Sequence, residues 1–208
     1  MEKHVYFVRH GQTDSNIEHI YRGKDAQLTD SGREQARTVA ERVARLNIQA
    51  IISSTLPRAV ETANIISERT GLTPERNGLF AEWREPTHIQ GVHSDHATAR
   101  STFEAIHAAI DPDYRHTDEE NFSEMLVRAE SVLHTLEEHS AERICVIAHN
   151  GFLRVLIGRL VFQDLFNKTL FIAFLRNAAL DNTSITYARY TPDRSWQLVT
   201  WNDQSHMG

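Results

Sequence analysis

Short apolar runs alternate with segments of helical periodicity through most of the chain. Continuous apolar runs predict buried strands, because parallel strands that are covered on both faces carry apolar side chains throughout. These runs are residues 5–8, 50–52 and 144–147. Between and before them, apolar residues recur every three or four positions, as amphipathic helices require. These helical segments are residues 36–46, 60–66 and about 123–138. The pattern predicts an α/β fold with parallel strands joined by helices.

Local signals place the ends of these elements. The segment Thr29 to Gly32 marks the start of the first helix, Pro57 fits the first turn of the second, and Gly71 stops it. Residues 184–190 and 196–201 are rich in β-branched and aromatic side chains, which predicts a hairpin on the sheet edge.

Two other segments differ from the helix and strand pattern. The apolar run 170–175 is too short to span a bilayer, so it is a core element or, alternatively, the contact of a homodimer. Residues from about 83 to 122 are rich in polar side chains and interrupted by proline and glycine. We interpret them as a helical or loop cap inserted into a single domain of residues 1–208. Its aromatic side chains line the cap or form a small core of their own: Trp83, Phe103 and Phe122.

Composition narrows the class of protein. A net charge of −6 and a pI near 6.0 argue against a nucleic-acid partner, because most of the surface would repel phosphates. Cys145 is the only cysteine and lies in an apolar run, so it is expected to be buried and unpaired. The start of the chain lacks the apolar stretch of a signal peptide, and no segment is long enough to cross a membrane, so a cytoplasmic location is expected.

Three polar turns carry the candidate chemistry, and each follows a predicted strand. The first is Arg9 to Asn16, the second is Ser53 to Ala63, and the third is Ala148 to Arg154. Ligands of open α/β sheets bind at the carboxyl ends of the strands. If the three strands are parallel, the turns therefore meet in one basic pocket on an acidic protein, and such a pocket is suited to a phosphate group.

The residue types in these turns agree with a phosphate site. Arg9 offers a planar donor fork to phosphate oxygens, and neighbouring cations keep the imidazole of His10 neutral and nucleophilic. Gly11 permits close approach of a ligand, and Asn16 adds a hydrogen-bond donor. Arg58 opens a helix, where it joins the free backbone amides in binding an anion. Taken singly, an Arg-His pair at a strand end, or an arginine on a helix face, is equally a solvated surface feature.

These motifs together resemble the histidine phosphatase superfamily, which includes the cofactor-dependent phosphoglycerate mutases. The resemblance covers nearly the whole chain. Its matching elements are the signature Arg9-His10-Gly11, the turn Leu28 to Gly32, the element Ser53 to Ala63, and His149 after a late core strand. A serine or threonine often precedes the second histidine of the family, whereas this chain has Ala148, which leaves the histidine itself unchanged.

The resemblance implies a three-layer α/β/α fold with a mostly parallel central sheet and a cap. It also implies that His10 is phosphorylated while Arg9, Arg58 and His149 hold the transferring group, with no metal and no cofactor. The family's acidic residue matches Glu82. The resemblance implies that Glu82 first protonates the leaving alkoxide and then, as a base, activates water. Glu85 is the alternative residue for this role. If Glu82 has no catalytic role, it is expected to be a solvated carboxylate of a loop.

Further positions are weaker candidates. Arg22 and Gly23 fall where relatives line the mouth of the pocket, and Asn150 adjoins His149, so we assign all three to substrate binding. Arg128 is expected to be a salt-bridged surface residue rather than part of the pocket. The histidines of the cap match no compact zinc motif and are expected to be solvated: His88, His93 and His96.

The leading functional hypothesis is hydrolysis of a small phosphate ester. A phosphoglycerate-type mutase is the main alternative, but such enzymes carry an Arg-Tyr-Gly stretch after the acidic residue, and here Trp83 to His88 follows Glu82. A catalytically silent protein that binds a phosphorylated ligand is a third alternative, which the intact set of basic residues disfavours. The identity of the ester is open, because the cap that contacts the leaving group has the least recognisable pattern.

Overall fold

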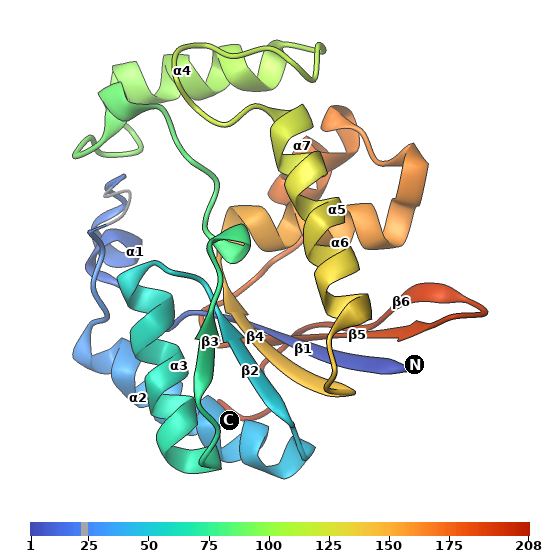
Figure 1. Cartoon of the computed structure of the whole chain (residues 1–208). Helices are drawn as coiled ribbons and strands as arrows, with labels where there is room; N and C mark the ends of the chain where they lie inside the picture. The colour runs from blue at the N-terminus through green and yellow to red at the C-terminus, as the bar shows by residue number, and fades with distance from the viewer. Residues whose placement is uncertain (22–24) are drawn as a thin grey trace.

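A six-stranded sheet forms the centre of the computed structural model, which describes residues 1–21 and 25–208 (Figure 1). The strand order is β3-β2-β4-β1-β5-β6. Neighbours among the first four strands run parallel, whereas β5 pairs antiparallel with β1 and with β6. The strands are β1 (Lys3–Arg9), β2 (Ala50–Ser53), β3 (Pro74–Arg76), β4 (Arg143–Ala148), β5 (Ile185–Thr191) and β6 (Ser195–Asp203). The predicted parallel sheet with an edge hairpin is confirmed.

Helices follow the strands in the described chain. They are α1 (Asp14–Glu18), α2 (Asp30–Val43), α3 (Pro57–Thr70), α4 (Ala97–Ala108), α5 (Phe122–Glu138), α6 (Asn150–Phe162) and α7 (Lys168–Asn177). Short 3-10 turns occur at Ala44–Leu46, Gly78–Phe80, Thr87–Ile89 and Gln163–Leu165. None of the helices in the described residues is long and apolar enough to cross a bilayer.

Two apolar layers cover the faces of the sheet, because side chains alternate between faces along each strand. Tyr6 and Val8 point to the face that α2 and α3 cover, whereas Val5 and Phe7 point to the face covered by α5 and α6. Figure 1 shows these helices on opposite sides of the sheet. The three-layer α/β/α architecture implied by the family resemblance is confirmed. The run 170–175 lies in α7, where Phe171 is buried and its neighbours pack against the same core.

Local chemistry fixes where the helices begin and end. The Thr29 side chain accepts a hydrogen bond from the Gly32 amide (2.9 Å) and caps α2. Pro57 occupies the first turn of α3, and Gly71 ends it with a φ of 75°, a left-handed conformation that favours glycine. A Cβ atom on Gly32 would lie only 2.1 Å from the carbonyl oxygen of Gln12. Glycine at this position therefore lets α2 pack directly against the turn that carries His10.

The segment predicted to be a cap lies apart from the sheet and contains the twelve-residue helix α4 (Figure 1). The buried residues of α4 are Ala99, Thr102 and Ile106, so its apolar stripe is made mostly of small side chains. The Phe103 ring packs against Trp83 and Tyr21, with ring centroids 5.7 Å and 5.1 Å apart. Phe122 instead packs against Phe171, in the main core. The cap is thus held to the body by aromatic contacts and by a short antiparallel bridge between Ile20 and His93.

Candidate active site

The three predicted turns meet at one edge of the sheet, because β2, β4 and β1 are adjacent and parallel. Arg9 ends β1 and His10 follows it, Arg58 lies in the first turn of α3 after β2, and His149 follows β4. The ring centroids of His10 and His149 are 5.1 Å apart, and the Arg58 Nε lies 3.2 Å from His10 Nε2. The structure therefore brings together the four basic residues that were predicted from separate parts of the chain.

The His10 imidazole is almost fully buried, with 3% of its surface exposed. Its Nδ1 lies 2.7 Å from the carbonyl oxygen of Gly11, which can only accept a hydrogen bond, so Nδ1 carries the proton. Burial and the charges of Arg58 and Arg9 lower the pKa of His10 well below its usual value. The ring is consequently neutral near pH 7, and Nε2 carries a lone pair, which accepts a hydrogen bond from Arg58 Nε (3.2 Å).

His149 lies fully buried beside His10. Its Nε2 is 2.7 Å from the Ser54 hydroxyl, which also accepts a hydrogen bond from the Leu56 amide (3.2 Å). The hydroxyl can donate its proton to His149 Nε2, and in that tautomer the ring carries its own proton on Nδ1. Nδ1 is buried and has no partner among the residues that the structure describes. Burial and the charges of Arg58 and Arg9 lower the pKa of His149, so its ring is neutral near pH 7.

The two arginines of the site are also withdrawn from solvent. Arg9 donates to the Leu180 carbonyl oxygen through Nη1 (2.6 Å), and its buried Nε has no partner in the described chain. Burial lowers the pKa of Arg9 to about 10, which keeps it charged at neutral pH. Arg58 is 6% exposed, and burial lowers its pKa as well. Buried cationic donors are far more effective for an anion than exposed ones, because water does not screen them.

A second group of contacts holds the turn after β1 in place. The Gly11 amide donates to the Thr62 hydroxyl (3.1 Å), and Asn182 donates to the His10 carbonyl oxygen (2.9 Å) and to Asn16 Oδ1 (3.2 Å). Asn16 and Asn182 both line the cavity at this edge, whereas Gly11 is buried behind it. Sequence reasoning missed Ser54 and Asn182, since each acts through a contact with a residue distant in the chain.

Glu82 lies at the positive end of α6. Its Oε1 accepts hydrogen bonds from the amides of Phe152 (2.8 Å) and Trp83 (2.9 Å), and its Oε2 accepts one from Gly151 (3.1 Å). The backbone amides of a helix N-terminus lack partners within the helix, and a carboxylate satisfies them well. Gly151 allows this contact, because a Cβ there would lie 2.9 Å from Oε1. Glu82 is therefore fixed beside His149 rather than solvated in a loop.

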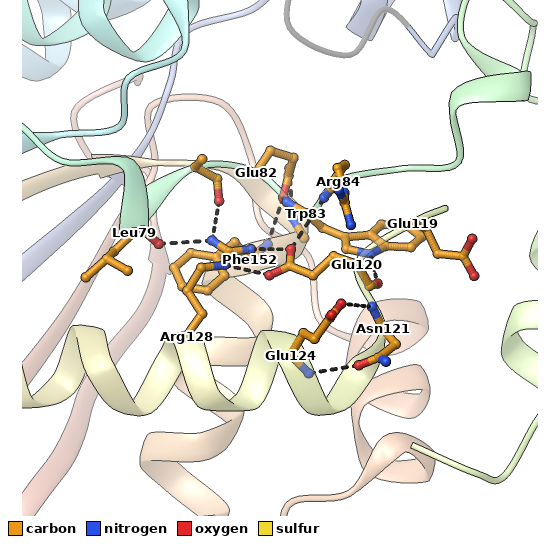
Figure 2. A network of polar contacts seen from close by, with 12 residues as sticks. Leu79, Glu82, Trp83, Arg84, Glu119, Glu120, Asn121, Glu124, Arg128 and Phe152 are labelled. Carbon is orange, nitrogen blue, oxygen red and sulfur yellow. Dashed lines mark hydrogen bonds and ion pairs between the residues drawn. The ribbon is translucent and has the colours of Figure 1, made fainter. Parts of the chain in front are cut away.

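Arg128 clamps the segment that carries Glu82 (Figure 2). Its guanidinium pairs with the Glu120 carboxylate (2.6 Å) and donates to the carbonyl oxygens of Leu79 (2.9 Å) and Ala81 (2.7 Å). It also lies 3.8 Å from the ring centroid of Phe152. The predicted salt bridge of Arg128 is present, but the prediction that it lies on the surface is wrong, since its side chain is only 15% exposed. Leu126 packs against the core, as its place in the apolar stripe of α5 predicts.

Glu85 is a second carboxyl group near the phosphate site. Burial and the nearby charge of Glu82 raise the pKa of Glu85 to about 7, although Arg58 acts in the opposite direction. The carboxyl group of Glu85 is therefore partly protonated at neutral pH. Glu85 therefore meets one requirement of a general acid that the sequence alone did not reveal.

One cavity of about 670 Å³ lies at this edge of the sheet, and His149 and Gly11 are buried behind the residues that line it. The predicted site residues that line it are Arg9, His10, Asn16, Arg58, Glu82 and Asn150, together with Glu85. Arg22 and Gly23 lie outside the described residues. Within residues 1–21 and 25–208, no group of three or more His, Cys, Asp or Glu side chains is arranged to hold a metal ion. The cap histidine His88 instead contacts the Thr102 hydroxyl (2.9 Å).

Comparison with known proteins identifies the family. Residues 5–204 match the histidine phosphatase superfamily (branch 1). The chain belongs to that superfamily. The family predicted from the signature around His10 is thus confirmed, and the match extends over almost the whole chain.

Individual relatives carry the names of both phosphatases and mutases. The chain is 30% identical to a probable phosphoglycerate mutase GpmB of Enterobacter sp., over 98% of this chain and 94% of that protein. It is 29% identical to the adenosylcobalamin/alpha-ribazole phosphatase of Salmonella typhimurium, over 76% of this chain and 79% of that protein. The structure of a mycobacterial glucosyl-3-phosphoglycerate phosphatase complexed with VO3 superposes with a TM-score of 0.79 at 25% identity, covering 97% of this chain and all of that one.

Proposed function

We propose that this histidine phosphatase hydrolyses small phosphate monoesters through a phosphohistidine formed on Nε2 of His10. The observation that carries the proposal is the buried, neutral imidazole of His10, whose Nε2 lies 3.2 Å from Arg58 Nε. Buried donors from three separate turns surround it. A lone pair on nitrogen, placed among cations, is the arrangement that attack on a phosphoryl group needs.

The reaction consists of two in-line displacements. His10 Nε2 attacks phosphorus, the bond from phosphorus to the ester oxygen breaks, and the leaving oxygen takes a proton from a carboxyl group of the Glu82 and Glu85 pair. That carboxylate then takes a proton from water, whose oxygen attacks phosphorus and breaks the bond to His10. Inorganic phosphate leaves, and both His10 and the carboxyl group return to their starting states.

Fixed donors stabilise the transferring group. In both transition states negative charge spreads over the three equatorial oxygens of phosphorus. The fold holds Arg58 in place before any ligand enters, together with Arg9 Nε and His149 Nδ1, which lack a partner among the described residues, so these donors bind the oxygens without reorganisation. We assign Arg9, Arg58 and His149 to this role, and Asn16 and Asn150 to contacts at the rim of the cavity.

Hydrolysis is favoured over the mutase reaction by the residues around the carboxyl pair. A mutase must protect its phosphohistidine from water until the product is rephosphorylated. Here the segment after Glu82 lacks the Arg-Tyr-Gly stretch expected of mutases, and the phosphate cavity opens into a second large cavity under the cap. Phosphatases among the relatives support the same assignment.

Phosphate release from a panel of monoesters, measured with EDTA and without any bisphosphate primer, tests the proposal. We expect steady turnover of para-nitrophenyl phosphate and of several alkyl phosphates, unchanged by EDTA, because the site uses fixed organic donors. A requirement for added divalent metal would contradict this mechanism. Turnover only after priming with a bisphosphate would move the assignment to the mutase.

Three features stay predictions from the sequence. They are a single domain of residues 1–208, a cytoplasmic location and a homodimer. The homodimer would use the exposed residues of α7, whose buried side already contributes to the core.

A further inference from the structure

A second cavity of about 930 Å³ adjoins the phosphate cavity under the cap. We call it the cap pocket; it lies between α4 on one side and α5 and α7 on the other. Six residues line both cavities: Tyr21, Glu82, Trp83, Glu85, Ser94 and Asn150. A phosphate ester with its phosphorus beside His10 therefore has its leaving group at the entrance of the cap pocket.

The wall of the cap pocket nearest the shared residues is aromatic and apolar. Trp83 forms an edge-to-face pair with Phe103 of α4. On the side of α5 and α7, Phe122 and Phe171 stack with ring centroids 5.5 Å apart. Ile172 and the residues that follow it on α7 extend this wall. A pocket of this size and character binds a ring system or an alkyl body much better than a three-carbon polyol, which would leave the apolar wall facing water.

Cationic side chains gather where the last turn of α4 faces α7. His107, Lys168 and Arg176 all line the pocket there, and the charges of Arg176 and Lys168 help burial to lower the pKa of His107. Lys168 is 7% exposed and donates a single long hydrogen bond to the Asp111 carbonyl oxygen (3.4 Å). Arg176 has no hydrogen bond or ion pair with any residue that the structure describes, so its donors face the pocket and solvent.

The acidic residues of the same pocket are mostly neutralised by partners. Glu120 pairs with Arg128, and the Glu119 carboxylate accepts hydrogen bonds from the backbone amides of His116 and Thr117. Glu104, on α4, is exposed, whereas Glu82 and Glu85 lie at the boundary with the phosphate cavity, away from α7. On the side of the pocket formed by α7, the charge of Lys168 is thus partly offset by Asp111 and Glu119, whereas Arg176 has no ion pair among the described residues.

We propose that the cap pocket binds the leaving group of the ester, and that this group combines a bulky apolar or aromatic body with an anionic substituent. The apolar body packs between Phe103 and Phe171, and the anion binds Lys168 and Arg176. The proposal rests on the hydrolysis at His10 proposed above, and it adds the class of substrate.

Matched esters test the proposal in the full-length protein. We would compare kcat/KM for 6-carboxy-2-naphthyl phosphate with that for its neutral 6-carboxamide analogue, in the wild-type protein and in Arg176→Gln. Loss of one charge-assisted hydrogen bond should reduce the preference for the carboxylate by about tenfold. The matched control Arg194→Gln, which removes an exposed arginine of the β5–β6 hairpin, should keep the wild-type preference.

Filling the pocket supplies a second test. Ile172→Trp should lower kcat/KM for naphthyl phosphates by at least about tenfold relative to methyl phosphate, because the added ring occupies the space of the leaving group. Equal kcat/KM values for the carboxylate and carboxamide esters in the wild-type protein would overturn the claim that the leaving group carries an anionic substituent. If Ile172→Trp leaves kcat/KM for naphthyl phosphates unchanged, the claim that their leaving group binds in the cap pocket is overturned.

Binding measurements separate this proposal from the proposed hydrolysis. Naphthyl phosphonates cannot be hydrolysed, and their dissociation constants follow from quenching of Trp83 fluorescence in the pocket wall. Tighter binding of the carboxylated phosphonate, reduced by Arg176→Gln, supports the substrate class even if no ester is turned over. Absence of turnover would then contradict only the proposed hydrolysis. Equal affinities of the two phosphonates would overturn the proposal for the cap pocket.

Discussion

His10→Ala abolishes phosphate release in our account, with an expected loss of at least about 10⁴-fold in kcat, because the other imidazole of the three turns, His149, has its Nε2 hydrogen-bonded to the Ser54 hydroxyl (2.7 Å). Steady-state assays with para-nitrophenyl phosphate measure the loss directly. His134→Ala is a matched control, since His134 is exposed on α5 and is 68% accessible to solvent. It should retain the wild-type rate.

The His10→Ala protein should still bind inorganic phosphate, because Arg9, Arg58 and His149 are unchanged. Calorimetric titration with phosphate therefore distinguishes a missing nucleophile from a collapsed site. Turnover within tenfold of wild type in a folded His10→Ala protein would refute nucleophilic catalysis by this residue.

Glu82→Gln should reduce turnover most for esters with poor leaving groups. Protonation by a general acid contributes about 10²–10⁴-fold for an alkoxide and little for a good leaving group such as para-nitrophenolate. We therefore expect a large loss with alkyl phosphates and a loss below about tenfold with para-nitrophenyl phosphate. The measurement is kcat across a series of leaving groups of increasing basicity, for the wild-type protein and for the variant.

Glu85→Gln is the matched comparison, and its effect should depend on pH. Because the pKa of Glu85 is raised to about 7, its carboxyl group is neutral below that pH and charged above it. The added charge repels the phosphate ester, so KM of the wild-type protein should rise as the pH passes through 7, and this rise should be absent in Glu85→Gln. If Glu85→Gln instead shows the loss that depends on the leaving group, and Glu82→Gln does not, the role of general acid belongs to Glu85.

The basic centre of the site could be predicted because of the way parallel sheets are built. Arg9, His10, Arg58 and His149 each follow an apolar run, and the carboxyl ends of adjacent parallel strands lie together whatever the distance along the chain. The period of apolar residues and the position of polar turns predicted parallel strands joined by helices, whereas the three-layer order was implied by the family resemblance.

Contacts between distant segments could not be predicted in this way. The amides that hold Glu82 belong to Gly151 and Phe152, about seventy residues further along, and nothing in the local sequence of either segment indicates the pairing. The burial of Arg128 was missed for the same reason, since its partners are carbonyl groups of another segment. The bounds of helix α4 could not be predicted, because its small and polar residues make a weak apolar stripe. Its N-cap residue is His96, which is not one of the residues usual at that position.

The central claim is that His10 carries the phosphoryl group during turnover, and trapping that intermediate tests it most directly. The wild-type protein would be mixed with a rapidly cleaved aryl phosphate, quenched in alkali within milliseconds, digested and analysed by mass spectrometry. We predict a phosphoryl group on the peptide that contains His10, stable in alkali, labile in acid, and absent from the His10→Ala protein. Phosphate release at full rate with no label on His10 at any quench time would contradict the account.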